Sequence, residues 1–137
     1  MHAFTTQVPG AIVFSALADH HGNVWTIAAD GQNLRQLTAG TSDQGIQRVL
    51  PTGELVVTRM EEDRTAHLAV TDRDGGNPRP LVRGTGEWLQ DISPDGKTLL
   101  YLRVDTPRAL WSVPIAGGEP RKIASDFNYF ASVSPDN

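Results

Sequence analysis

Three similar units of about 43 residues follow one another along this chain, and this repeat restricts the possible folds more than any other feature. Gly31, Gly75 and Gly117 are spaced by 44 and 42 residues. A second turn signal repeats with a spacing of 43 and reads VPG at 8–10, PTG at 51–53 and PDG at 94–96. Repeats of this length indicate one supersecondary unit copied several times, each unit packing on its neighbours.

The segment 84–125 is the clearest copy of the unit. It contains four extended runs, WLQDI, TLLYLR, LWSVPI and PRKIA, separated by turn signals such as Ser93-Pro94-Asp95-Gly96. Proline fixes φ and glycine accepts a left-handed corner, so this tetrapeptide favours a chain reversal. Four short strands joined by tight turns predict one antiparallel sheet. Four-stranded sheets repeated every 43 residues are typical of β-propeller blades.

The whole chain is predicted to be all-β, with three four-stranded blades in one unit over residues 1–137. The repeats are placed at about 11–45, 46–87 and 88–128. The first repeat supplies three strands, at 11–15, 24–29 and 34–38. The run AIVFS at 11–15 is apolar throughout, which predicts a strand covered on both faces. A closing strand at 129–133 would complete the first blade, and residues 3–7 are the alternative for the same place.

Composition excludes several classes of protein. The net charge of −4 and the pI near 5.4 argue against a nucleic-acid-binding protein, which would carry a basic face. The chain has no cysteine, so disulfides and thiolate metal sites are excluded. We find no apolar segment long enough for membrane insertion and no signal peptide at the start of this sequence. The cellular compartment stays open.

The repeats resemble the WD40-like (PD40) β-propeller repeats of the TolB and dipeptidyl peptidase IV type, which also occur in sensor propellers attached to bacterial kinases. The matching segments are VSPD at 133–136, ISPDG at 92–96 with the following KTLLYL, VWTIAADGQNLRQLT at 24–38 and LWSVPIAGGEPRKI at 110–123. The second unit departs from this pattern, with LPTG at 50–53 in place of SPDG. The resemblance implies a propeller fold and leaves the function open, because such blades serve many functions.

Motifs that could carry chemistry are weak in this sequence. DRDGGN at 72–77 opens like a calcium loop but lacks the bidentate glutamate, so a plain turn is the preferred interpretation. His20, His21 and His67 could form a metal or general-base site, although solvated loop positions are favoured. No G-x-S-x-G motif is present. We therefore expect no catalytic residue, no metal site and no cofactor. Arginines recur in one column, and we interpret them as packing and ion-pair positions on the outer strand: Arg35, Arg79 and Arg121.

Irregular polar residues are expected to gather on one face of the blades. The loops between the second and third strands of each blade lie on the same side as the connections between blades, whereas the opposite side has tight turns. Binding residues are commonly carried by loops on a rigid scaffold. The candidates there are His20, His21, Glu61, Arg64, Arg103, Asp105 and Arg108. Trp88 and Tyr129 begin inner strands and could line one mouth of the central channel.

The function favoured by these observations is a non-catalytic interaction module that binds a protein or peptide through the loop face or the channel mouth. The alternatives are an accessory propeller of a prolyl-oligopeptidase-like hydrolase and an excised or engineered propeller fragment. Propellers close with about four to eight blades. Three blades would leave apolar sheet faces bare, so we expect a head-to-tail homodimer with six blades, in which residues 129–133 complete the first blade of the partner.

Overall fold

The computed structural model describes residues 10–18, 20–39, 42–61, 63–82, 86–104, 108–126 and 131–135. These residues form eleven strands, and no helix able to cross a membrane is found among them. The strands are β1 (Ala11–Ala18), β2 (His21–Ala28), β3 (Arg35–Gln36), β4 (Asp43–Val49), β5 (Leu55–Met60), β6 (Ala66–Thr71), β7 (Arg79–Pro80), β8 (Glu87–Ile92), β9 (Thr98–Arg103), β10 (Ala109–Pro114) and β11 (Arg121–Ser125).

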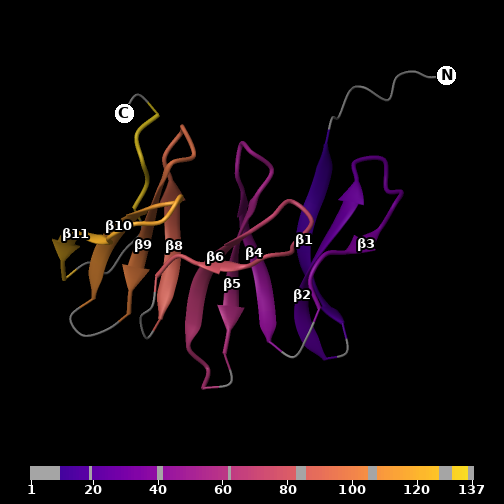
Figure 1. Ribbon diagram of the computed structural model, residues 1–137, viewed down its shortest axis with the longest axis horizontal. Helices are drawn as coiled ribbons and strands as arrows, with labels where there is room; N and C mark the ends of the chain where they lie inside the picture. The colour runs from indigo at the N-terminus through magenta and orange to yellow at the C-terminus, as the bar shows by residue number, and fades with distance from the viewer. Residues whose placement is uncertain are drawn as a thin grey trace.

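The strands form three antiparallel sheets that stand side by side in chain order (Figure 1). The first sheet has the order β1-β2-β3, the second β4-β5-β6-β7 and the third β8-β9-β10-β11. Within each sheet, every strand pairs with the next one along the chain, as hairpin-length connections require. The predicted all-β class and the blade-like sheets are confirmed.

The first sheet has three strands because it lacks an inner strand within the described residues. Its β1 occupies the place of β5 and β9, which pair with β4 and β8 on their inner edges. In the described part of the chain, β1 pairs with β2 alone. Of the closing strand predicted at 129–133, residues 131–133 are not in a strand, and 129 and 130 lie outside the described residues. The strand was predicted to pair with β1 of a second chain, so the closing strand stays a prediction. The alternative at 3–7 lies outside the described residues.

Several strand boundaries differ from the prediction. The inner strand β4 begins at Asp43, three residues before the predicted start, and β8 begins at Glu87, one residue early. The outer strand β7 covers two residues, as β3 does at the equivalent place. These boundaries matter, since the added first residues of β4 and β8 are both acidic.

The turns between inner and second strands are closed in two different ways. In the third sheet, the Gly96 N–H donates to the Ser93 carbonyl over 2.8 Å, and the Ser93 hydroxyl donates to Asp95 Oδ1 over 2.6 Å. In the second sheet, the Gly53 N–H donates to the Leu50 carbonyl over the same 2.8 Å. Leu50 has no hydroxyl and is buried instead, at 4% exposure. The departure of LPTG from SPDG therefore keeps the turn and replaces the hydrogen bonds of the Ser93 hydroxyl with the burial of Leu50.

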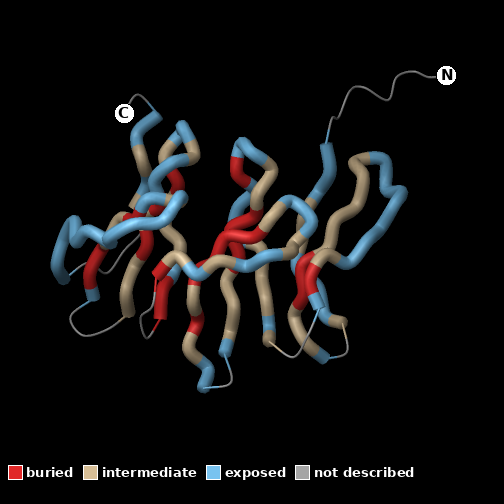
Figure 2. Tube along the Cα trace, viewed as in Figure 1, coloured by how far each residue is buried: buried red, intermediate tan, exposed pale blue. Residues whose placement is uncertain are grey.

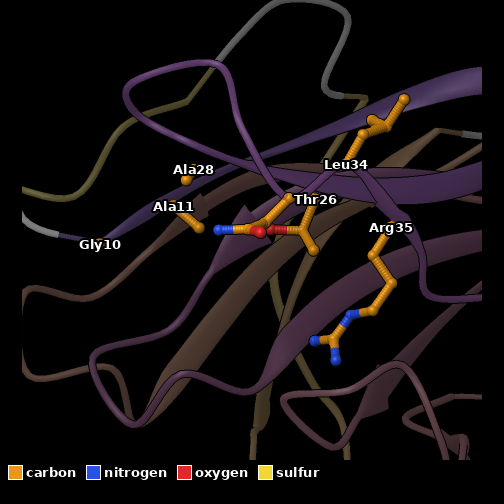
Figure 3. Close-up of a pocket in the computed structure, with 7 residues that line it drawn as sticks. Gly10, Ala11, Thr26, Ala28, Leu34 and Arg35 are labelled. Atoms are coloured by element: carbon orange, nitrogen blue, oxygen red, sulfur yellow. The ribbon is translucent and has the colours of Figure 1, made fainter.

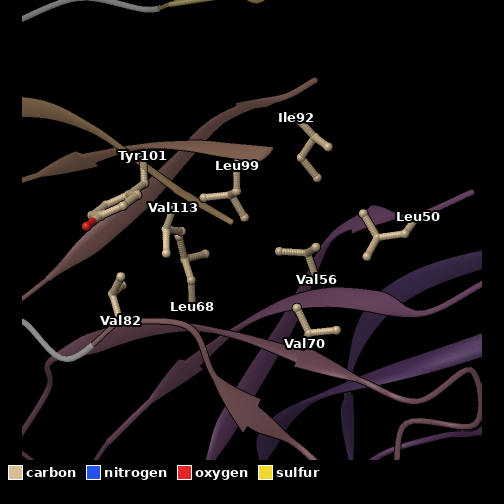
Figure 4. Packing of buried hydrophobic residues seen from close by; sticks show 9 residues of the cluster. All are labelled: Leu50, Val56, Leu68, Val70, Val82, Ile92, Leu99, Tyr101 and Val113. Atoms are coloured by element: carbon tan, nitrogen blue, oxygen red, sulfur yellow. The ribbon is translucent and has the colours of Figure 1, made fainter. Parts of the chain in front are cut away.

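Apolar side chains fill the space between the second and third sheets (Figure 4). Val56, Leu68 and Val70 from the second sheet meet Leu99 and Val113 from the third. All five are at most 2% exposed. Burying a Val or Leu side chain contributes roughly 1.5–3 kcal/mol relative to leaving it in water, so this layer is the main apolar contribution to the association of the two sheets.

A smaller apolar cluster joins the first and second sheets. Val24 of β2 packs with Leu55 and Val57 of β5, and Val13 of β1 lies against them. Figure 2 shows most of the buried chain in the second and third sheets and less of it in the first. Within β1, Ile12 and Leu17 are 53% and 75% exposed. The prediction that residues 11–15 are covered on both faces is therefore wrong for this chain, because one neighbouring sheet, the second, covers β1.

Gly75→Ala is expected to lower the free energy of unfolding more than Gly31→Ala, its matched control. Both glycines have φ near +85° to +88°, so alanine adds strain of roughly 1 kcal/mol at either position. At Gly75 the new methyl group would also lie 2.6 Å from the backbone oxygen of Leu37 in the first sheet, whereas nothing lies within 4 Å at Gly31. Such overpacking adds about 1–3 kcal/mol. Urea unfolding measures both losses, and equal losses would contradict this contact between sheets.

Candidate functional site

The candidate binding residues that were predicted in hairpin loops lie at one end of the three sheets. We call this end the loop face. It comprises the β1–β2 and β5–β6 hairpins, the end of β9 and the starts of β4, β8 and β10, at the lower edge in Figure 1. His20 occupies the β1–β2 turn with a φ of 69°, and His21 begins β2. Glu61 and Arg64 close the β5–β6 hairpin, where the Arg64 N–H donates to the Glu61 carbonyl over 2.9 Å.

The remaining predicted residues lie in and around the third sheet. Arg103 ends β9 and Arg108 stands just before β10. Trp88 is the second residue of β8 and is 52% exposed. Asp105 and Tyr129 lie outside the described residues. The described candidates therefore lie on the loop face and are distributed over all three sheets.

Two acidic residues that sequence reasoning did not single out organise this end of the molecule. Glu87, the first residue of β8, has 0% exposure and reaches back to the second sheet. The Leu68 N–H donates to its Oε1 over 3.4 Å, and its Oε2 lies 3.4 Å from His67 Nδ1. Glu87 thus satisfies a backbone group of β6 beyond the end of the short strand β7.

Asp43 repeats this arrangement one sheet earlier. It is the first residue of β4, and its Oδ1 accepts the Gly22 N–H over 2.8 Å and lies 3.4 Å from His21 Nδ1. Asp43 and Glu87 are 44 residues apart, which is the repeat spacing. The sequence shows the repeated acid, and a histidine about twenty residues before each one, but it does not show that they are in contact. The physical role of the acid is to join an inner strand to the preceding sheet.

A chain of polar contacts leads from the surface to Glu87. The Thr65 hydroxyl donates to Asp63 Oδ1 over 2.6 Å, and Thr65 Oγ1 lies 2.9 Å from His67 Nε2. The bond from Thr65 is the largest cause of the lowered pKa of the Asp63 carboxyl. Because Asp63 takes the hydroxyl proton, His67 Nε2 donates to Thr65, which is the reverse of what a base activating a nucleophile requires.

Aromatic and cationic side chains stack beside Glu87 in the third sheet. The Arg103 guanidinium lies 5.1 Å from the ring centre of Trp111, within cation–π distance. Tyr101 is 1% exposed, and burial raises the pKa of its phenol to about 12, with the Arg103 charge opposing this rise and the Glu87 charge adding to it. Arg103 is therefore engaged with Trp111 and the electrostatics of this layer.

A hollow of about 360 Å³ opens on the second sheet next to His67. Its lining combines charged groups with an apolar floor and consists of Arg59, Glu61, His67, Leu68, Ala69, Pro80 and Val82. Arg59 Nε is shielded from solvent and has no hydrogen-bond partner among the described residues. The hollow can hold a small side chain, with apolar contacts below it and charges of both signs at its wall.

The inner strands are joined by a second acidic residue of β8. Asp91 Oδ1 lies 3.6 Å from Arg48 Nη1 of β4, and Asp91 Oδ2 accepts the Val133 N–H over 2.7 Å. That bond is the main cause of the lowered pKa of the Asp91 carboxyl. The Ala131 N–H donates to Gln90 Oε1 over 3.1 Å. Residues 131–135 therefore lie beside β8, where a following unit would begin.

Among the described residues, no group of three or more His, Asp and Glu side chains is placed to hold a metal ion. His20, His21 and His67 are not brought together: His21 and His67 pair with the acids of separate strands. The calcium-loop interpretation of DRDGGN gives way to a turn in which the Gly75 N–H donates to the Asp72 carbonyl.

Comparison with solved structures identifies the architecture. TolB from Acinetobacter baumannii matches with a TM-score of 0.68 over 84% of this chain, at 13% sequence identity. A proposed TolB from Agrobacterium tumefaciens matches with a TM-score of 0.69 over 90%, at 20% identity. The chain has the fold of a TolB propeller segment. It spans 30% and 47% of the length of these two proteins.

No protein-family profile matches the sequence, and no curated protein is detectably similar to it. The TolB-like fold is therefore established by structure, with identities too low to carry function across. The resemblance that the SPDG turns indicated is confirmed at the level of the fold.

Glu87→Ala is expected to lower the free energy of unfolding by about 1–3 kcal/mol, since it leaves the buried Leu68 N–H without its acceptor. Glu87→Gln should lose less, because the amide oxygen can still accept that bond. Asp43→Ala is the matched control at the equivalent position. Its pair with His21 is partly exposed, with side chains at 38% and 56%, so its loss should stay below about 1 kcal/mol. Urea unfolding of the three variants checks this order, and a larger loss for Asp43→Ala would contradict it.

Proposed function

We propose that this chain is a non-catalytic propeller module that binds a protein or peptide on its loop face. The observation that carries the proposal is Trp88, a tryptophan 52% exposed at the loop-face end of an inner strand. Tryptophan and arginine are the residue types that most often dominate the binding energy of protein interfaces. Exposed Arg64 and Arg108 occupy the same face.

The surroundings of Trp88 suit recognition more than chemistry. Glu87, the residue before it, is held by the second sheet, so the backbone that carries Trp88 is anchored before a ligand arrives. Preorganisation of this kind reduces the ordering cost of binding. The hollow at Arg59 and His67 would accept a side chain from the same ligand. The proposal uses no metal and no cofactor.

Selection of peptides from a displayed random library against the 137-residue chain tests this proposal. Trp88→Ser is expected to weaken the selected peptides by tenfold or more, in line with the roughly 2 kcal/mol typical of an interface hot spot. Ile123→Ser is the matched control, because Ile123 is a similarly exposed apolar residue, at 48%, on the outer strand β11. Peptides that bind both variants equally well would overturn the loop face as the binding surface.

We also propose that the chain assembles as a head-to-tail dimer. Two observations support this. The inner edge of β1 has no strand partner among the described residues, while β5 and β9 have theirs. Residues 131–135 lie beside β8 through Gln90 and Asp91, at the place where a further blade would follow. A second copy placed there would bring its own β1 next to this segment, and the two chains would contain six blades.

Light scattering of the full chain measures the dimer directly. A mass near twice 14.9 kDa is expected, and removal of residues 126–137 should shift the protein to monomer because the contact with the partner's β1 is lost. Removal of residues 1–9 is the control and should leave the dimer intact. A monomeric full chain would overturn the dimer, and dissociation caused by the N-terminal removal alone would assign the place beside β1 to residues 3–7.

A further inference from the structure

A second hollow, of about 530 Å³, lies on the first sheet at the end opposite the loop face (Figure 3). Gly10, which precedes β1, and Ala28, which ends β2, mark its position at the tight-turn end of the sheet. Its lining comprises Gly10, Ala11, Thr26, Ala28, Asn33, Leu34 and Arg35. Arg35 is its one charged residue, and its side chain is exposed.

The equivalent arginine in the second sheet binds two carboxylates. Arg79 Nη1 donates to Asp72 Oδ1 over 2.8 Å, and Arg79 Nη2 donates to Glu54 Oε2 over 2.7 Å. The predicted ion-pair role of the arginine column is thus confirmed at Arg79, whereas the ion pairs among the described residues include neither Arg35 nor Arg121. Charge-assisted bonds of this length are among the stronger side-chain hydrogen bonds.

The register of the strands shows which residues of the first sheet correspond to these carboxylates. The pair Thr26–Arg35 in the first sheet matches the pair Val70–Arg79 in the second, 44 residues later. Thr26 pairs with Val13 in the first sheet and Val70 pairs with Val56 in the second, so Ala11 stands at the position of Glu54, 43 residues earlier.

Ala28 likewise stands at the position of Asp72. Ala11 and Ala28 are cross-strand partners. Glu54 and Asp72 stand opposite each other in the same way, because each is the residue next to the pair Leu55–Thr71. The first sheet therefore keeps the arginine and replaces both carboxylates with methyl groups.

This replacement leaves Arg35 without the partners that Arg79 has. The ion pairs found in the described part of the chain do not include Arg35. Ala11 is two residues from Val13 in β1, and Thr26 and Ala28 are two and four residues from Val24 in β2, so they share a face with these valines. Arg35 pairs with Thr26 and lies on that face too, which is the one that turns toward the second sheet. A unit that preceded the first sheet would pack on the other face of that sheet. It would therefore not cover the hollow.

We propose that the Arg35 hollow binds a ligand with two carboxylates, spaced like those of Glu54 and Asp72. The methyl groups of Ala11 and Ala28 leave room for the ligand's acidic groups, and Leu34, which is 59% exposed, offers an apolar contact for its methylenes. A single guanidinium lined by small and neutral side chains suits carboxylates better than a phosphate, which usually recruits several cations. Such a ligand is an acidic segment of a peptide or a small dicarboxylic acid.

Titration of the full-length chain by ¹⁵N NMR tests the site with defined probes. An acetylated, amidated peptide Gly-Glu-Asp-Gly and succinate are the two acidic probes, and the peptide Gly-Gln-Asn-Gly is the uncharged control. The acidic probes are expected to shift the Arg35 Nε–H and the amide signals of Thr26 and Ala28, whereas the control leaves them in place. Shifts with the peptide alone identify a peptide ligand, and shifts with succinate alone identify a small dicarboxylic acid.

Two variants decide whether Arg35 is responsible. Arg35→Gln should weaken binding about tenfold or more, as expected for loss of a charge-assisted hydrogen bond, while Arg121→Gln, in the same column of the third sheet, should not change it. The double variant Ala11→Glu with Ala28→Asp installs the carboxylates of the second sheet and should abolish binding in a chain that remains folded. The proposal is overturned if neither acidic probe shifts these signals, or if either variant at the hollow binds as the unchanged chain does.

Discussion

Packing of each sheet against the next is the constraint on which the rest of this structure depends. Side chains of a β-strand alternate between two faces, and in the second sheet both faces are covered. Val56 and Leu68 face the third sheet, whereas Val57 and Ala69 face the first. This explains why five of the six residues of β6 are buried. A sheet at the end of the stack, such as the first, has one covered face, and its β1 is correspondingly exposed.

Apolar contact between sheets is strong but not directional, so other groups must set how one sheet sits on the next. Acidic residues at the beginning or middle of the inner strands do this here. Asp43 and Glu87 each accept a backbone N–H from the preceding sheet, and Asp91 accepts one from residues after β11. The hydrogen bond to the buried carboxylate of Glu87 is costly to leave unmade, and together with the other two it disfavours sliding between sheets. Glu87 also fixes the backbone that carries Trp88.

The sequence was sufficient for the architecture because its signals are local. The glycines of the turns require φ > 0, and each is followed or preceded by an apolar run of strand length, so sheet order follows from the chain itself. The acidic contacts could not be predicted in the same way. Glu87 reads as a polar connecting residue, and its partners His67 and Leu68 lie about twenty residues earlier. Their contact depends on how two sheets stack, which a linear pattern does not encode. For the same reason, the sequence could predict which residues lie on the loop face. It could not predict the hollow beside His67.

Differences between repeats carry information that the repeat itself cannot. Where a column is kept, as with the acids Asp43 and Glu87, the residue has the same structural task in both places. Where a column changes and the change is compensated, the fold absorbs it, as burial of Leu50 replaces the hydroxyl bonds of Ser93. Arg35 is a third case, since its column is kept while its carboxylate partners have become alanines. Among the described residues, the guanidinium of Arg35 has no carboxylate partner within its own sheet, and this is the reason for placing the proposed ligand there.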